Sequence, residues 1–343
     1  MTLNLLELTF DELTAALGRR YQRGAFHAAA LMREFYGRGN PRAYEAPEVQ
    51  ASKELAGRLS ADLAPVPGTV VKETESQGVV KFVTRFEDDC TVESVVLPMA
   101  THATVCVSSQ VGCRMGCRFC ETARMGWRRD LSAAEIAGQV WTARQRFGAQ
   151  VRNVVFMGMG EPLDNFSAVV QAIRVLNDQR GLDVALRHMT VSTCGLADGI
   201  HRLAALGLPH LKLAVSLNAA EDRLRDWLMP INRRFPLARL KEALTAFPLG
   251  KNDAIMAAYV LIPGVNDRVE DARAVARFLA PLRSRINLIP FNPGSQTDYP
   301  APGEEDIEAF ARLLTDAGVF VCRRNTKGRD LMAACGQLGG RSV

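Results

Sequence analysis

The sequence ATVCVSSQVGCRMGCRFC, residues 103–120, joins a short apolar segment to three closely spaced cysteines. Residues 103–108 have the composition of a buried β-strand, and Cys113, Cys117 and Cys120 follow it closely. The stretch therefore predicts a strand whose carboxyl end opens into a loop that carries three thiols.

Apolar strands and amphipathic helices alternate through the rest of the chain. Strands are expected at residues 103–108, 153–157, 188–193, 211–216, 255–262 and 286–289, and helices between them include residues 133–147, 168–176, 237–247 and 268–279. These strand–helix repeats predict a parallel sheet, because parallel neighbours need crossover connections. Six strands are fewer than the eight of a closed barrel, so the predicted fold is α/β, a partial (β/α)6 barrel open on one side.

Two regions precede this barrel in the sequence. Residues 1–65 have a helical pattern, with apolar positions at helix spacing over residues 3–17 and 26–35, and predict a small helical domain. Residues 66–100 predict a β-strand extension, with short strands at 70–74, 79–86 and 91–97. Residues 101–343 form the barrel and its tail, and include a late helix at 304–317 and a strand at 319–323.

The composition is typical of a soluble globular protein. Hydrophobic residues make up 48% and charged residues 23%, and the longest apolar run, residues 254–262, is too short to span a membrane. The N-terminal sequence MTLNLLELTFDEL carries acids where a secretory signal carries basic residues, so a cytoplasmic location is expected. Forty-two Lys and Arg against 37 Asp and Glu give a net charge of +5, which is compatible with a polyanionic partner without requiring one.

The cysteines are the strongest chemical signal. There are eight, and in a reducing cytosol clustered cysteines are more often ligands or redox groups than disulfides. Cys113, Cys117 and Cys120 form a CxxxCxxC motif, which can hold one face of a [4Fe-4S] cluster and leave one iron without a protein ligand. S-adenosyl-L-methionine (SAM) can occupy that iron, and reductive cleavage then gives methionine and a 5′-deoxyadenosyl radical. The alternatives are a structural zinc site, for which no fourth ligand lies at a suitable local spacing, and a chance grouping.

A candidate SAM site follows the later strands. Residues 158–162, GMGEP, come directly after the second strand, and we expect Gly160 to approach SAM closely and Glu161 to accept hydrogen bonds from its ammonium group. Ser192, Ser216 and Asn292 fall at or just beyond the ends of later strands, where parallel β/α folds bind ligands. Taken singly, each of these is equally compatible with an ordinary strand end or loop.

Several motifs resemble one known family. CVSSQVGC at 106–113 and AACGQL at 333–338 are similar to the RlmN/Cfr family of radical SAM RNA adenine methyltransferases. The resemblance extends to ESVVLP at 93–98, MPIN at 229–232 and INLIPFNP at 286–293, and it covers most of residues 69–340. It implies a further SAM segment at Ser216, Leu217 and Asn218. Asn218 replaces a usual histidine there, and Leu331-Met332 replaces a usual Ile-Asp pair.

The resemblance also implies catalytic roles. Cys335 would take a methyl group from one SAM, and a radical made from a second SAM would remove hydrogen from that methyl group, so that the methylene radical adds to adenine. Cys106 would release the product through a transient disulfide with Cys335, and Glu93 would take the proton from the ring carbon. From its position alone, Cys106 is also compatible with a buried strand residue. Cys90, Cys194 and Cys322 match no role in the family and are predicted to pack in the core.

The implied partners are RNA and an electron donor. The family resemblance implies methylation of carbon 2 of an adenine in 23S rRNA, with a tRNA adenine as a second substrate. It also implies a reductant such as flavodoxin or ferredoxin, an RNA-binding role for residues 1–65 and a monomeric enzyme. Two groups of basic residues flank the reaction centre, and either a phosphate contact or a solvated surface explains them. These are Arg124, Arg128 and Arg129, and Arg323, Arg324, Lys327 and Arg329.

Three other functions remain open at this stage. The first is methylation of carbon 8 of the same rRNA base; the Ser-Gln-Val-Gly run before the cluster motif favours carbon 2. The second is a non-catalytic iron–sulfur protein that binds RNA. The third is a radical SAM enzyme that acts on a small molecule or a peptide.

Overall fold

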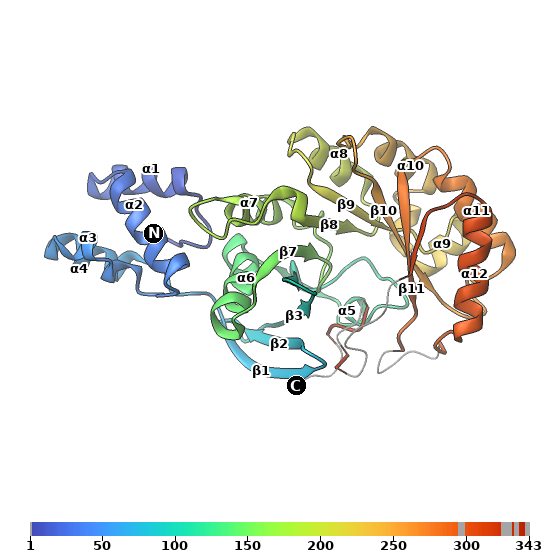
Figure 1. Ribbon diagram of the computed structural model, residues 1–343, viewed down its shortest axis with the longest axis horizontal. Coiled ribbons are helices and arrows are strands. Elements are labelled where there is room, and N and C mark those ends of the chain that lie inside the picture. Colours follow the sequence, from blue (N-terminus) through green and yellow to red (C-terminus); the bar gives the residue numbers. More distant parts are fainter. Residues whose placement is uncertain (1, 294–298, 324–330, 333–335, 340–343) are drawn as a thin grey trace.

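The computed structural model describes residues 2–293, 299–323, 331–332 and 336–339. One ten-stranded sheet runs through the molecule, with a helical head at one end and helices along the sheet (Figure 1). Cys335, Arg324, Lys327 and Arg329 lie outside the described residues. No helix within the described ranges is both long and apolar enough to cross a bilayer.

The helical head was predicted correctly in type but not at its start. Its elements are α1 (Phe10–Tyr21), α2 (Ala25–Met32), η1 (Arg33–Gly37), η2 (Ala43–Glu45), α3 (Pro47–Gln50) and α4 (Lys53–Asp62). Helix α1 begins at Phe10 and not near Leu3, because Thr9 caps it in a reciprocal capping box with Glu12. Leu3 instead forms an isolated β-bridge with Leu63.

Three antiparallel strands form the first part of the sheet, as predicted. They are β1 (Thr69–Ser76), β2 (Val79–Arg85) and β3 (Thr91–Pro98). Gln77 and Gly78 both have a positive φ, 50° and 76°, which suits the two-residue hairpin turn between β1 and β2. Strand β3 then pairs antiparallel with the first barrel strand, so the extension and the barrel share one sheet.

The barrel strands follow one another in chain order across the sheet. They are β4 (Ala103–Cys106), β7 (Val151–Phe156), β8 (Met189–Thr193), β9 (Lys212–Ser216), β10 (Ile255–Leu261), β11 (Ser284–Pro290) and a short β12 (Val321–Arg323). All neighbours in this group are parallel. Because each connection moves one place in the same direction, right-handed crossovers put the connecting helices on one face, as in a barrel. The predicted partial barrel is thus confirmed.

Each helix that was predicted from the sequence in this region begins and ends within two residues of its predicted bounds. They are α6 (Ala133–Phe147), α7 (Phe166–Asn177), α8 (Ala197–Ala205), α10 (Leu237–Ala246), α11 (Val269–Leu279) and α12 (Glu304–Asp316). Shorter elements lie in the connections and were not predicted individually. These are β5 (Gln110–Gly112), α5 (Glu121–Arg124), β6 (Trp127–Asp130), η3 (Leu186–His188), α9 (Asp222–Leu228) and η4 (Pro230–Arg233).

The two faces of the parallel sheet carry different side chains. Val191, Leu213 and Tyr259 alternate with the residues of the opposite face and are fully buried in the main apolar core. On the other face the registers align Ser192 with Ala214, and Ser216 with Ala258. Because these residues are small, this second face leaves room for a cavity at the carboxyl ends of the strands.

Candidate active site

A loop with fixed ends carries the three motif cysteines. It leaves strand β5 at Gly112 and returns through α5 and β6, and β5 and β6 pair antiparallel. Gly112 has φ +76°, and a Cβ there would lie 1.7 Å from the carbonyl oxygen of Gly126. Only glycine allows the two ends of the loop to approach this closely. Cys113, Cys117 and Cys120 are therefore presented on a short arc above the barrel.

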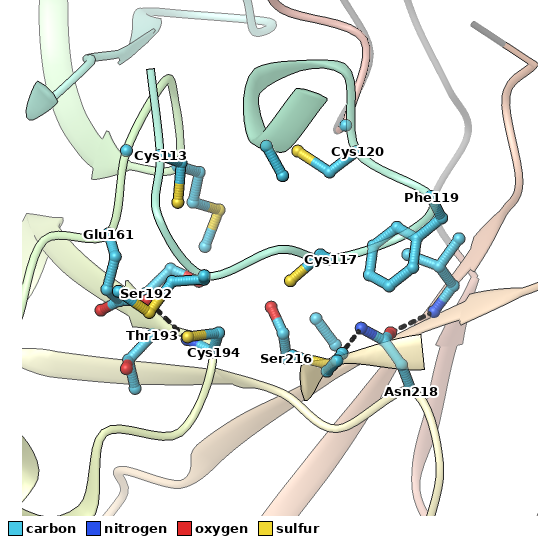
Figure 2. Close-up of a pocket in the computed structure, with 18 of the residues that line it drawn as sticks. Cys113, Cys117, Phe119, Cys120, Glu161, Ser192, Thr193, Cys194, Ser216 and Asn218 are labelled. Atoms are coloured by element: carbon cyan, nitrogen blue, oxygen red, sulfur yellow. Dashed lines mark hydrogen bonds between the residues drawn. The ribbon is translucent and has the colours of Figure 1, made fainter. Parts of the chain in front are cut away.

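The three cysteines line a cavity at the carboxyl ends of the parallel strands. Figure 2 shows their sulfur atoms around a shared space between the loop and the strands. The cavity is partly open to solvent, and most of its exposed lining is apolar. Its other walls come from the loops and ends of β7 to β11, and include Gly160, Glu161, Ser192, Ser216 and Asn218.

The thiols fit a metal group that carries positive charge. Burial raises the pKa of Cys113 to about 12, and burial together with the neighbouring thiols raises the pKa of Cys117 well above its usual value. Iron would offset this cost, because a metal ligand must be a thiolate. A structural zinc ion takes four protein ligands, whereas three thiolates can hold a [4Fe-4S] cluster that keeps one iron free of a protein ligand. The donor set therefore fits the predicted iron–sulfur cluster.

Glu161 is buried and already engaged by the protein. Its carboxylate accepts hydrogen bonds from the backbone N–H of Leu163 at 3.0 Å and of Cys194 at 2.7 Å. Burial raises its pKa, while these backbone hydrogen bonds oppose the rise. The side chain thus ties the loop after β7 to the loop after β8. Its expected contact with the SAM ammonium group stays a prediction, and would have to use the remaining lone pairs.

The polar run before the cluster loop fixes the GMGEP turn. Gln110 accepts a hydrogen bond from the backbone N–H of Glu161 at 2.8 Å, and Ser108 Oγ accepts one from Met159 N at 2.8 Å. Both side chains are fully buried. Gly160 has φ +97°, and a Cβ there would lie 2.6 Å from the Gln110 Cβ. Sequence reasoning missed this scaffold, although two polar residues directly after an apolar strand were a usable signal.

The other predicted SAM residues divide into two groups. Ser192 and Ser216 line the cavity, whereas Leu217 is buried in the apolar core and is not part of the cavity wall. Asn218 lines the cavity, but its Oδ1 accepts from Val260 N at 2.9 Å and its Nδ2 faces the Met229 sulfur, as Figure 2 shows. Asn292 is buried, and its Oδ1 accepts no hydrogen bond within the described ranges. An orphaned buried oxygen of this kind fits a site that binds a polar ligand.

Cys106 and Glu93 lie on the same face of the sheet as this cavity. Across the sheet, Val95 is paired with Cys106, and Cys106 is paired with Val155. Val155 is paired with Thr190, which lies two residues before the cavity residue Ser192 on the same strand. Paired residues project to one face, and so do residues two apart on a strand, so Glu93 shares the face as well. Both side chains are buried, at 9% and 4% exposure.

Arg225 is a site residue that sequence reasoning missed. Its guanidinium is fully buried and donates to the carbonyl oxygens of Cys194 at 2.7 Å, Ser216 at 3.1 Å and Leu217 at 3.1 Å. A fourth bond goes to Asn232 Oδ1 at 2.7 Å. Arg225 therefore holds the carboxyl ends of β8 and β9 together beneath the cavity. It sits in a short polar helix, which gives no periodic signal of burial.

The prediction that Cys90, Cys194 and Cys322 pack in the core was wrong in one case. Cys194 is buried in an apolar cluster as predicted, and it also lines the cavity, where burial and the Glu161 carboxylate raise its pKa. Cys322 is exposed on β12. Cys90 is half-buried beside the main core, as expected.

Two of the predicted basic residues are already paired with acids. Arg129 bonds both Asp88 and Glu135, and its interaction with these carboxylates raises its pKa. Arg323 pairs with Glu304. Arg124 and Arg128 are exposed close to the cluster loop. Two further arginines of that loop stack on exposed tryptophans: Arg114 lies 4.1 Å from the Trp127 ring centre, and Arg118 lies 5.1 Å from that of Trp227.

Comparison with known proteins gives a consistent result along almost the whole chain. Residues 107–279 match the model of the Radical SAM superfamily. The chain is 40% identical to the probable dual-specificity RNA methyltransferase RlmN 1 of Protochlamydia amoebophila, over 98% of this chain and 94% of that protein. It is also 40% identical to the dual-specificity RNA methyltransferase RlmN of Campylobacter fetus, over 99% and 98%. A radical SAM methyltransferase from Sphaerobacter thermophilus has the same fold, with a TM-score of 0.90, 36% identity and coverage of 98% and 99%.

Proposed function

The chain belongs to the RlmN family of RNA methyltransferases within the radical SAM superfamily, and from this premise we propose that it methylates carbon 2 of an adenine in 23S rRNA. A tRNA adenine is the proposed second substrate. The observation that carries the proposal is the cavity that joins the CxxxCxxC loop to the ends of the parallel strands, on the sheet face that also carries Glu93 and Cys106. One face of the sheet thus carries the proposed base and one of the two proposed thiols beside the proposed cofactor site.

Cys113, Cys117 and Cys120 would hold a [4Fe-4S] cluster, and the strand ends would hold SAM. When bound, the cluster supplies one electron to SAM at its open iron, which gives methionine and a 5′-deoxyadenosyl radical. Ser192 and Ser216 offer hydroxyl groups to the cosubstrate from adjacent strands. The Oδ1 of Asn292, which accepts no hydrogen bond from the described residues, offers an acceptor, and the glycine backbone at Gly160 permits close approach.

Two cysteines and one carboxylate would act on the substrate. Cys335 takes the methyl group from a first SAM and carries the carbon to adenine after hydrogen abstraction. The radical adduct also has to lose one electron, which the oxidised cluster would accept, and Glu93 takes the proton that leaves the ring carbon. The Cys106 thiolate then attacks the Cys335 sulfur and breaks its bond to carbon, which forms a disulfide; the released carbon takes up a proton and stays on adenine as a methyl group. Reduction of the disulfide returns both thiols.

RNA would approach across the exposed surface of the cluster loop. Trp127 and Trp227 are 40% and 39% exposed, and each is covered by an arginine of the same loop. Exposed arginine–aromatic pairs suit the stacking of bases and the neutralisation of phosphates. We propose that Arg124 and Arg128 extend this surface and that residues 1–65 form the accessory RNA-binding domain. The target adenine must leave its stack to expose its ring carbon.

The remaining partners follow from the same chemistry. A one-electron reductant, such as flavodoxin or ferredoxin, would supply the cluster. All proposed groups lie on one chain, so a monomer is sufficient. A cytoplasmic location fits a reaction that needs reduced thiols.

A direct assay tests the proposal. The chain is reconstituted anaerobically with iron and sulfide, reduced, and given SAM with a labelled methyl group together with 23S rRNA and tRNA transcripts. We expect deoxyadenosine, and 2-methyladenosine after nuclease digestion and mass spectrometry. 8-Methyladenosine would replace the carbon-2 assignment, and deoxyadenosine with unmodified RNA would point to another substrate. An absence of deoxyadenosine would overturn the radical SAM mechanism.

A further inference from the structure

A buried lysine beside the active site has no role in the chemistry above. Lys81 lies on β2, and its Nζ is 3.5 Å from Glu93 Oε1. The two side chains are only 7% and 5% exposed. Burying an ion pair is expensive, because both charges lose water and their mutual attraction seldom repays the full cost. A buried pair of this kind therefore calls for a functional reason.

Both members of the pair also contact the C-terminal tail. Lys81 Nζ donates to the carbonyl oxygen of Met332 at 3.4 Å, and the backbone N–H of Gly339 donates to Glu93 Oε2 at 2.9 Å. Met332 precedes Cys335 in the sequence and Gly339 follows it. The pair thus binds the tail at two points, one on each side of the thiol that is proposed to carry the carbon unit.

The cluster loop holds the same tail from the other side. Glu121 N donates to the Gly336 carbonyl at 2.8 Å, and Thr122 Oγ1 donates to the Leu338 carbonyl at 2.7 Å. Gly339 has φ +89°, and a Cβ there would lie 2.3 Å from the Met125 sulfur. Residues 336–339 therefore lie between the buried pair and the helix that directly follows Cys120, with little room for adjustment.

The geometry points to Lys81 as a positioning residue: with Glu93 it clamps Met332 and Gly339, which flank Cys335 in the sequence, and holds residues 336–339 next to the cluster loop. This inference rests on the proposed function, and it assigns a part to a residue outside the cluster, SAM and thiol sites. Lys81 shares its sheet face with Glu93 and Cys106, because Lys81 is paired with Val95 and Val95 with Cys106. The buried Lys81 ammonium group thus fixes the positions of the tail and of Glu93, the proposed base, relative to each other.

The test separates tail positioning from cofactor chemistry. Lys81→Met keeps the length of the side chain and removes its charge, and Arg85→Met removes an exposed cation from the same strand as a matched control. Both variants are reconstituted as the full chain. Three quantities are measured: iron per chain, deoxyadenosine released from SAM, and methyl groups transferred to RNA. Hydrogen exchange of the peptide that contains Met332 and Gly339 is followed in parallel.

We expect Lys81→Met to retain its iron and to release deoxyadenosine within about twofold of the wild type, while RNA methylation falls about a hundredfold, the cost of a misplaced reacting group. Tail amide exchange should become at least about tenfold faster, because the Gly339 amide loses its fixed acceptor. Lys81→Arg should restore most of the protection, and Arg85→Met should match the wild type. A Lys81→Met chain with wild-type exchange and wild-type methylation would overturn the inference.

Two further results distinguish loss of the clamp from a folding defect and from a failure of the proposed function. If Lys81→Met does not fold, Gly339→Ala tests the same contact from the tail, and the same loss of protection and methylation is expected. Unchanged exchange and methylation in a folded Gly339→Ala chain would then count against the clamp. If the wild type neither cleaves SAM nor modifies RNA while its tail is protected through Lys81, the proposed function fails and the clamp stands.

Discussion

The cavity under the cluster loop and the sheet surface of β2 to β4 beside it are built in different ways. The cavity walls come from motifs that are each local in the sequence, such as the loop from Cys113 to Cys120 and the GMGEP turn. The second surface brings together Lys81, Glu93 and Cys106 with a tail more than two hundred residues away. Short motifs that the fold brings together form the proposed cofactor site, whereas the proposed substrate chemistry depends on docking of the C-terminal tail.

The strongest test of this difference is the loss of a cluster ligand. Cys117→Ala should lose the iron and lower deoxyadenosine formation by more than about a thousandfold, which corresponds to about 4 kcal/mol of barrier. The tail should stay docked, because none of its described contacts uses this thiol. Iron analysis, hydrogen exchange and a SAM cleavage assay measure the three outcomes. Cys322→Ala, at an exposed thiol on β12, is the control and should behave as the wild type.

A thiol of the second surface should give the opposite pattern. Cys106→Ala is expected to keep SAM cleavage within about threefold of the wild type and to lower multiple-turnover methylation by about a hundredfold. The reason is that product release needs a second sulfur, so a covalent protein–RNA adduct should accumulate. Denaturing gel electrophoresis with labelled RNA detects the adduct. Cys90→Ala should form no adduct, and free turnover of Cys106→Ala would contradict the assigned role.

Arg225 offers a test of the frame beneath the cavity. Arg225→Gln should lower the free energy of unfolding by about 3 kcal/mol, because buried carbonyls of Cys194, Ser216 and Leu217 lose their donor. Urea denaturation of the cluster-free chain measures this loss without any cofactor. Arg223→Gln, on the same helix but exposed, should change stability by less than about 0.5 kcal/mol. Equal stability of the two variants would contradict this structural role of Arg225.

The smallest expected effect concerns an exposed ion pair that joins the cluster loop to the sheet surface of β2 to β4. Asp88, between β2 and β3, accepts from Arg129 Nη2 on β6 at 3.1 Å, and this bond lowers its pKa from 3.8 to about 2. When the pKa of a carboxyl group is lower in the folded than in the unfolded protein, its ionisation stabilises the fold at pH values above the unfolded pKa. This stabilisation is lost as the pH falls through the folded pKa. Asp88→Asn should therefore cost less than about 1 kcal/mol at pH 7, and the difference should shrink between about pH 4 and pH 2. Denaturation at a series of pH values measures it, with exposed Glu87→Gln for comparison; a difference that does not vary with pH would contradict this origin.

The sequence predicted the parts that short-range patterns control. Strand and helix positions in the barrel followed from apolar periodicity, and the three-cysteine loop followed from spacing alone. Arg225 and Lys81 were not predicted, because a charged residue in a short polar helix or in an edge-side strand has the pattern of a solvated surface. Their burial depends on carbonyl groups and tail atoms brought together only by the tertiary fold. The place of Cys194 in the cavity wall was not predicted for the same reason, since nothing local places its thiol beside Cys113 and Cys117.

The strand order of the sheet has a consequence for synthesis on the ribosome. Each strand of the ten-stranded sheet after β1 pairs with the strand of that sheet made just before it, so a growing chain can add strands in sequence without waiting for a later partner. The contacts of residues 336–339 are the exception, because they reach back to Glu93 and Thr122. A nascent chain can thus complete its sheet while Lys81 and Glu93 are still uncovered, and the reactive centre closes only after translation has passed the tail.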